Sequence, residues 1–242
     1  MLAAVARSSG ATLGFEIDAA AEVTVTPGCT GALAAVMLGL VEPGDEVVLF
    51  EPYYDSYRAA VAMAGAVPRF VALREGGGEA GDGFGFDVDE LRAAFGPRTR
   101  AVVVNTPHNP TGKVFTRDEL GQIAALCCEH DVIAVSDEVY ERLVFAGEHV
   151  SIASFDGMRE RSAVCSSLGK TYSLTGWKVG WASAPARLTA GSRAAHQFLT
   201  FSVPGPMQLG AVAALEHADG YVAGMRETLR KKQTQQEPGH TA

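Results

Sequence analysis

The sequence predicts an α/β fold in which helices pack against a mostly parallel sheet. Four short segments dominated by apolar residues read as buried strands, at residues 47–50, 101–105, 132–136 and 162–166. They are continuous rather than alternating, which is typical of strands covered on both faces. Helix-forming segments separate them, and this β-α-β order predicts a ligand site at the carboxyl ends of the strands.

The amino-terminal elements follow from periodicity and turn residues. Residues 1–9 carry an apolar stripe at helical spacing, but no helix start precedes it. We interpret them as the last turns of a helix in a chain cut short at this end. Residues 22–26 alternate like a strand, and a Pro-Gly pair separates them from a helix at residues 31–40. A helix at residues 55–64 and an extended segment at residues 67–73 continue the β-α-β order.

Residues 75–85 are rich in glycine, but we expect no turn from a strand to a helix here that would make a Gly-x-Gly-x-x-Gly spacing significant. We therefore exclude a dinucleotide fingerprint and expect a mobile surface loop. Thr116 and Glu119 form the pattern of a capping box, and apolar residues follow it at helical spacing up to Cys127. This helix is expected to cover one face of the sheet.

The carboxyl-terminal part contains a strand at residues 179–184 and helices at residues 186–201 and 207–216, separated by a Pro-Gly-Pro break. Residues 226–242 are polar and lack an apolar stripe, so we expect a frayed, disordered tail. Residues 1–225 then form one domain.

Composition limits the classes of partner. The formal net charge of −8 and the absence of Lys/Arg runs argue against nucleic acid or an acidic membrane surface. No apolar run reaches the roughly 18 residues of a membrane span, and the amino terminus lacks the basic start of a signal peptide. We expect a cytoplasmic protein that binds small molecules and further copies of itself.

The four cysteines are Cys29, Cys127, Cys128 and Cys165. They show neither CxxC nor Cys/His ligand spacing, so we expect buried, reduced thiols rather than metal ligands or disulfides.

A lysine-containing segment follows the last of the four buried strands. An amine that condenses with a carbonyl must be neutral, through desolvation or a neighbouring positive charge, and Lys170 at a strand's end is a candidate Schiff-base lysine. Ser167 and Lys178 offer a hydroxyl and a cation to an anionic group such as phosphate. Taken alone, the two lysines could equally be solvated surface residues. A P-loop is excluded, since Val164 stands where that motif needs glycine.

Other candidates follow strands or begin a helix. Cys29 and Thr30 lie where a turn leads into a helix, a place that suits phosphate but is also an ordinary helix start. Tyr54 could lie on a planar heterocycle or pack beneath a loop. Asp137 could pair with a protonated ring nitrogen, cap a helix or bind a metal.

Three motifs carry a family resemblance: Asn-Pro-Thr-Gly at residues 109–112, Asp-Glu-Val-Tyr at 137–140 and Ser-Leu-Gly-Lys at 167–170. Together with the order of the other candidates, they resemble the fold-type I pyridoxal-phosphate enzymes, specifically the class I/II aminotransferases. The similarity is greatest to the branch of kynurenine, glutamine, methionine and N-succinyldiaminopimelate aminotransferases. It covers roughly residues 22–216 and implies a three-layer α/β/α large domain that binds pyridoxal 5′-phosphate (PLP).

The resemblance implies a role for each candidate. Lys170 forms the Schiff base, Asp137 pairs with the pyridine nitrogen, and Tyr54 stacks on the ring. The phenolic oxygen is contacted by Tyr140 and Asn109, with Asn105 close by. The phosphate is held by Cys29, Thr30, Ser167 and Lys178.

The implied activity is ping-pong transfer of an amino group from an amino acid to a 2-oxo acid, by a homodimer in the full-length form. Such enzymes also have a small carboxyl-terminal domain with a carboxylate-binding arginine and an amino-terminal segment, and we expect both to be missing here. Two alternatives remain open: a cofactor-binding or ligand-sensing module without turnover, and a PLP-dependent carbon-sulfur β-lyase.

Overall fold

A seven-stranded sheet organises the computed structural model, which describes residues 1–77, 83–145 and 147–236. Its strands are, in spatial order, β1 (Val23–Thr26), β9 (Gly180–Ser183), β8 (Ser162–Ser167), β7 (Ile133–Asp137), β6 (Thr99–Asn105), β2 (Glu46–Glu51) and β3 (Val67–Ala72). The strands from β8 to β3 pair in parallel, while β9 is antiparallel to both of its neighbours. The predicted mostly parallel sheet is confirmed.

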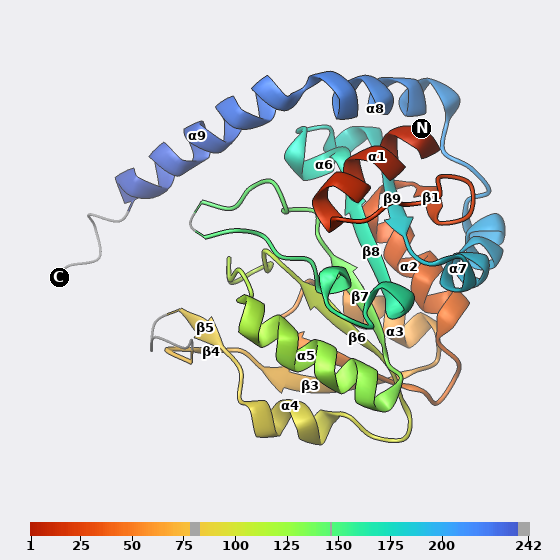
Figure 1. The fold of residues 1–242 in the computed structure, drawn as a ribbon, viewed down its shortest axis with the longest axis vertical. Coiled ribbons are helices and arrows are strands. Elements are labelled where there is room, and N and C mark those ends of the chain that lie inside the picture. The colour runs from red at the N-terminus through yellow and green to blue at the C-terminus, as the bar shows by residue number, and fades with distance from the viewer. Residues whose placement is uncertain (78–82, 146, 237–242) are drawn as a thin grey trace.

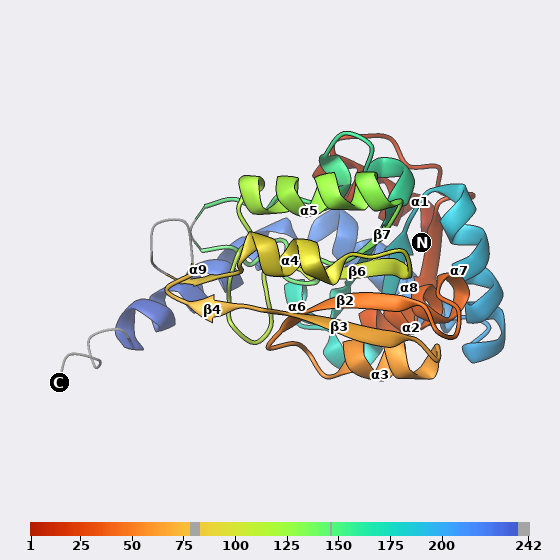
Figure 2. The same cartoon turned by 90° about the horizontal axis from the view of Figure 1, so that it is seen from below.

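Helices cover both faces of this sheet, which gives three layers (Figures 1 and 2). One face carries α2 (Gly28–Leu40), α3 (Ser56–Met63) and α7 (Ala186–Leu199). The other carries α4 (Val88–Ala94) and α5 (Arg117–His130). The capping box of α5 is present, with the Thr116 hydroxyl accepting from the Glu119 N–H and the Glu119 carboxylate accepting from the Thr116 N–H.

The remaining helices lie around the β9 end of the sheet. They are α1 (Leu2–Leu13), the short α6 (Leu168–Thr171), α8 (Gly205–His217) and α9 (Asp219–Gln236), and their apolar side chains form a third cluster with Trp181 of β9. Single turns of 3₁₀ helix occur at Ile152–Ser154, Arg159–Arg161 and Thr175–Trp177. No described helix has both the length and the apolar character needed to cross a bilayer.

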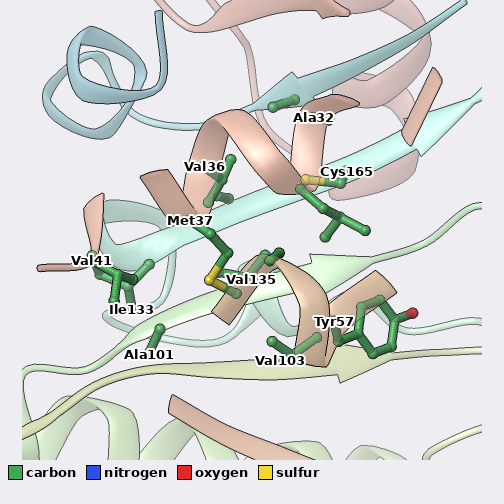
Figure 3. Packing of buried hydrophobic residues seen from close by; sticks show 14 of the residues in the cluster. Ala32, Val36, Met37, Val41, Tyr57, Ala101, Val103, Ile133, Val135 and Cys165 are labelled. Atoms are coloured by element: carbon green, nitrogen blue, oxygen red, sulfur yellow. The ribbon is translucent and has the colours of Figure 1, made fainter. Parts of the chain in front are cut away.

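Alternation along the strands divides the apolar core into two clusters. Ala101, Val103, Ile133 and Val135 face α2 and α3 (Figure 3). Their neighbours along the same strands face α5 instead, for example Val102. Burial on both faces explains why these strands are continuous apolar runs in the sequence.

Glycine contacts bring α2 close to its neighbours. A Cβ on Gly39 would lie 2.3 Å from the Gly191 carbonyl oxygen of α7. A Cβ on Gly180 of β9 would lie 2.4 Å from the carbonyl carbon of Gly28. Only a residue without a side chain allows such backbone approach, and the start of α2 is therefore fixed directly against β9.

Several elements differ from their predicted extent. Helix α2 begins at Gly28, three residues before the predicted start, and α4 was not predicted, although the Asp87 side chain caps it by accepting from two backbone N–H groups. The predicted glycine-rich loop begins and ends in a short hairpin, β4 (Arg74–Glu75) with β5 (Phe84–Gly85), while residues 78–82 lie outside the described residues.

The predicted frayed tail is helical as far as the structure describes it, through Gln236, and residues 237–242 lie outside the described residues. Within this helix Glu227 forms ion pairs with Arg230 and Lys231, at i,i+3 and i,i+4 spacing, which favour the helical conformation of this polar segment. Near its start, Val222 is buried in the third cluster.

All four cysteines are free, and three of them are buried as predicted. The prediction is wrong for Cys128, which is exposed, because the adjacent Cys127 takes the inward-facing position of α5.

Candidate active site

All ten predicted site residues line one pocket at the carboxyl ends of the central strands. They are Cys29, Thr30, Tyr54, Asn105, Asn109, Asp137, Tyr140, Ser167, Lys170 and Lys178. The sheet brings them together because β6, β7 and β8 are adjacent, parallel and end at the same edge. Their individual roles remain predictions.

Asn105 connects two strand ends and a loop. It pairs in register with Asp137, and its side-chain N–H donates to the Asp137 backbone carbonyl over 2.9 Å. Its amide oxygen accepts from the Asn109 N–H over 2.7 Å. Asn105 therefore fixes the loop that carries Asn109 at the pocket.

The Asp137 carboxylate is almost completely buried, with 4% of the residue exposed. It accepts hydrogen bonds from the Tyr57 hydroxyl, the Cys29 thiol and the Val139 N–H. Burial raises the pKa of the carboxyl, and the three donors oppose this effect. Within the described part of the chain no lysine, arginine or histidine forms an ion pair with it, so a cationic ligand would be its missing partner.

Lys170 lies on α6, immediately after β8, and is exposed toward the pocket. Its Nζ lies 5.7 Å from the centre of the Tyr140 ring. The turn after α6 packs back on it, with the Thr175 hydroxyl donating to the Gly169 carbonyl over 2.8 Å. The amine is thus exposed in the pocket beside the phenol ring of Tyr140.

The start of α2 lines the pocket and has the features of an anion-binding turn. The backbone N–H groups of its first turn have no intrahelical partners, and no side chain caps them. Lys178 stands beside this turn, with its Cδ 3.7 Å from the position of a Cβ on Gly28. It holds a left-handed backbone conformation, with φ of 53°. Unpaired N–H groups, a helix dipole and a cation together suit a phosphate.

Tyr54 lines the pocket with 38% of its surface exposed. Its ring meets that of Tyr57 edge to face, with centroids 5.8 Å apart. An exposed aromatic face at this position can receive a planar ring.

The sequence did not identify Tyr57, whose partner Asp137 lies 80 residues further along the chain. The sequence also did not show that the Cys29 thiol contacts the Asp137 carboxylate, at 3.4 Å. Because the side chain is directed there, only the backbone N–H of Cys29 is available to an anion at the start of α2. His108, which we did not select as a base, is buried and pairs with the Thr111 hydroxyl. Burial and then Lys113 lower the pKa of His108 to about 4, so it is neutral near pH 7.

The pocket thus combines an amine, a buried carboxylate and a helix start suited to an anion, the set of groups typical of enzymes that hold a planar, anionic cofactor. Residues 2–236 match the family model "Aminotransferase class I and II", and the chain belongs to this family of PLP-dependent aminotransferases. The family resemblance predicted from the motifs is confirmed.

Two curated relatives illustrate the similarity of this chain to known aminotransferases. The chain is 46% identical over 239 residues to a protein of Mycobacterium tuberculosis named probable N-succinyldiaminopimelate aminotransferase DapC, covering 98% of this chain and 59% of that protein. It is 45% identical over 213 residues to human kynurenine–oxoglutarate transaminase 1, covering 86% of this chain and 50% of that protein. The chain therefore spans between half and three fifths of the length of these relatives.

Solved structures agree with the fold. The structure of N-succinyldiaminopimelate aminotransferase from Mycobacterium tuberculosis has a TM-score of 0.92, covering 97% of this chain and 60% of that one at 46% identity. YbdL from Escherichia coli, described as having a methionine aminotransferase function, has a TM-score of 0.89 at 38% identity, over 96% of this chain and 60% of that one. The large-domain fold is thereby shown.

Proposed function

We propose that this chain forms the cofactor-binding part of an aminotransferase that transfers an amino group from an amino acid to a 2-oxo acid. When bound, PLP supplies an aldehyde that condenses with amines and an electron-withdrawing ring that acidifies the substrate's Cα–H. One observation carries the proposal. The buried Asp137 carboxylate, which has no cationic partner among the described residues, lines the same pocket as the Lys170 amine.

The donor set of the pocket fits PLP at each of its functional groups. Asp137 would hold the ring nitrogen in its protonated form. The first turn of α2 at Cys29 and Thr30, with Ser167 and Lys178, would hold the phosphate. Lys170 lines the same pocket, so its amine would be available to the cofactor's aldehyde.

The other lining residues would act on the ring and the substrate. Tyr54 would cover a face of the ring, while Tyr140, Asn109 and the nearby Asn105 would bind the ring's phenolic oxygen. Lys170 would first anchor the cofactor and, once displaced by the incoming amino acid, would carry a proton from the substrate's Cα on its Nζ. The amino donor would leave as its own 2-oxo acid, its amino group being retained at the site, before a second 2-oxo acid enters and takes that amino group. We therefore expect ping-pong kinetics.

The partners follow from this activity. We propose amino acids and 2-oxo acids as substrates, a homodimer for the full-length protein, and a cytoplasmic location. The names of the relatives suggest N-succinyldiaminopimelate, kynurenine and methionine as amino donors to test.

Reductive trapping tests the proposal directly. The purified chain is incubated with PLP, reduced with borohydride and digested, and the modified peptide is identified by mass spectrometry. We expect the label on Lys170 and an imine absorbance band that Lys170→Ala abolishes. Lys178→Ala is the matched control: it should weaken PLP binding but keep the label on Lys170. Absence of the band, or a label on another lysine, would refute the proposal.

Amino donors then test turnover. Adding an amino acid to the loaded full-length protein should consume the band and release its 2-oxo acid. A band that persists with every donor would instead indicate a binding module, and pyruvate released from cystathionine would indicate a β-lyase.

A further inference from the structure

The two oxygens of the Asp137 carboxylate are held by side chains from two different helices. The Tyr57 hydroxyl of α3 donates to Oδ2 over 2.8 Å, and the Cys29 thiol of α2 donates to Oδ1 over 3.4 Å. The Val139 N–H adds a third, backbone donor to Oδ1 over 3.3 Å. A carboxylate with one side-chain donor on each oxygen cannot rotate without losing one of them.

Both side chains are donors at neutral pH because both keep their protons. Burial, followed by the charge of Asp137, raises the pKa of the Tyr57 hydroxyl well above its ordinary value. A hydrogen bond with Cys165, then burial and then Asp137 raise the pKa of the Cys29 thiol in the same way. Neither group can therefore present a competing negative charge to the carboxylate.

The same two residues also adjoin other parts of the pocket lining, namely Tyr54 and the first turn of α2. Tyr57 closes one end of the apolar cluster on α2 and α3, with its hydroxyl directed away from the apolar side chains (Figure 3). Its ring contacts Tyr54, and its N–H donates to the Tyr54 carbonyl over 3.0 Å. Cys29 stands in the first turn of α2, beside Thr30. The contacts to Asp137 thus couple the carboxylate to the exposed aromatic and to the anion-binding turn.

We propose that Tyr57 and Cys29 form a carboxylate clamp, a pair of positioning residues that keep Asp137 ionised and aimed at a cationic ring nitrogen in the pocket. The inference rests on the proposed function and adds two residues to it. Neither residue needs to touch the reacting atoms. The clamp acts through the orientation and charge of Asp137, and its loss should change ligand binding through the protonation of that group.

The direction of the pH effect follows from the contacts. The Tyr57 hydroxyl lowers the pKa of Asp137 against the effect of burial, and the neighbouring charge of Glu138 raises it. Among the described residues, the other titratable groups around this site are Cys29, Tyr54, Tyr140, Cys165, Lys170 and Lys178. Removing the Tyr57 hydroxyl should therefore raise the pKa of Asp137 further. Since a cationic ring nitrogen needs the ionised carboxylate, acid should release PLP from this variant at a higher pH than from the unmodified protein.

Spectroscopic titration of PLP at several pH values tests the clamp in binding. Tyr57→Phe keeps the ring and should weaken PLP binding by roughly ten- to a hundredfold, as expected for a lost hydrogen bond to a charged group. Cys29→Ala removes a weaker donor and should cost about two- to fivefold, while Cys29→Ser should restore binding because a hydroxyl also donates. Tyr53→Phe is the matched control, since the Tyr53 ring stacks on that of Phe70. It should bind PLP as the unmodified protein does.

A measurement without cofactor separates this inference from the proposed function. Carbon-13 NMR of Asp-labelled, ligand-free chain gives the pKa of the Asp137 carboxyl in each variant, with Asp137→Asn assigning the signal. We expect Tyr57→Phe and Cys29→Ala to raise it and Tyr53→Phe to leave it unchanged. An unchanged pKa in Tyr57→Phe and Cys29→Ala would overturn the clamp, even if PLP binds to Lys170. If the unmodified chain binds no PLP, the proposed function fails while the NMR result still decides whether the clamp exists.

Discussion

Replacing Gly180 by alanine should destabilise the chain at the point where β9 meets the start of α2. The new Cβ would lie 2.4 Å from the Gly28 carbonyl carbon and 2.7 Å from the Cys29 nitrogen, and both are backbone atoms that cannot rotate away. An ordinary contact begins near 3.4 Å, so the two elements must separate by about 1 Å. Overpacking of this kind costs about 1–3 kcal/mol. The stiffer unfolded chain offsets about 0.4–1 kcal/mol of that.

The net loss is about 1–2 kcal/mol in the free energy of unfolding, measurable by urea denaturation of the ligand-free chain. For a chain of this size it corresponds to a melting temperature lower by roughly 2–8 °C. Gly176→Ala is the matched control, because its added Cβ meets nothing within 4 Å. If the two variants unfold at the same urea concentration, the close approach of β9 and α2 does not exist as described.

Three further changes have calculable effects. Thr116→Ala removes the cap of α5 and should lower the free energy of unfolding by about 1 kcal/mol in urea denaturation. Lys113→Met leaves the buried Glu119 carboxylate without its cation at 2.7 Å and should lower the free energy of unfolding by about 3–5 kcal/mol. Adding Glu119→Gln should recover part of this loss. A double variant no more stable than Lys113→Met alone would contradict the explanation. Burial raises the pKa of Glu141 from 4.5 to about 7, so the folded chain binds more protons than the unfolded one in this interval. Stability should therefore fall as the pH rises from about 4.5 to about 7, by up to about 3 kcal/mol, and melting curves of Glu141→Gln should show a smaller fall.

The strands and most of the site could be predicted because the information is local. Asn105 and Asp137 each end a continuous apolar run, and parallel pairing brings such ends to one edge of the sheet. The capping box at Thr116 is likewise contained within four residues. Each of these patterns lies within a short stretch of the sequence and can be recognised there.

The missed features depend on contacts between distant segments. A role for Tyr57 becomes visible only in the fold, where α3 brings its hydroxyl to Asp137 at the end of β7. Nothing in the sequence around Tyr57 indicates this contact. Cys29 was assigned to the phosphate from its place at a helix start, but its thiol is directed to the carboxylate by the packing of α2 on the sheet. The helical conformation of α9 beyond residue 226 was missed because charge pairing rather than an apolar stripe supports it.

The pairing of β1 sets a constraint on how the protein is made. This strand occupies residues 23–26, yet among the described residues its one neighbour in the sheet is β9, whose residues 180–183 are synthesised more than 150 residues later. Until β9 emerges from the ribosome, β1 has no partner strand and the first turn of α2 lacks its backbone contact with Gly180. Closing so long a loop is slow, and a nascent chain would gain its binding pocket only in the last stage of folding.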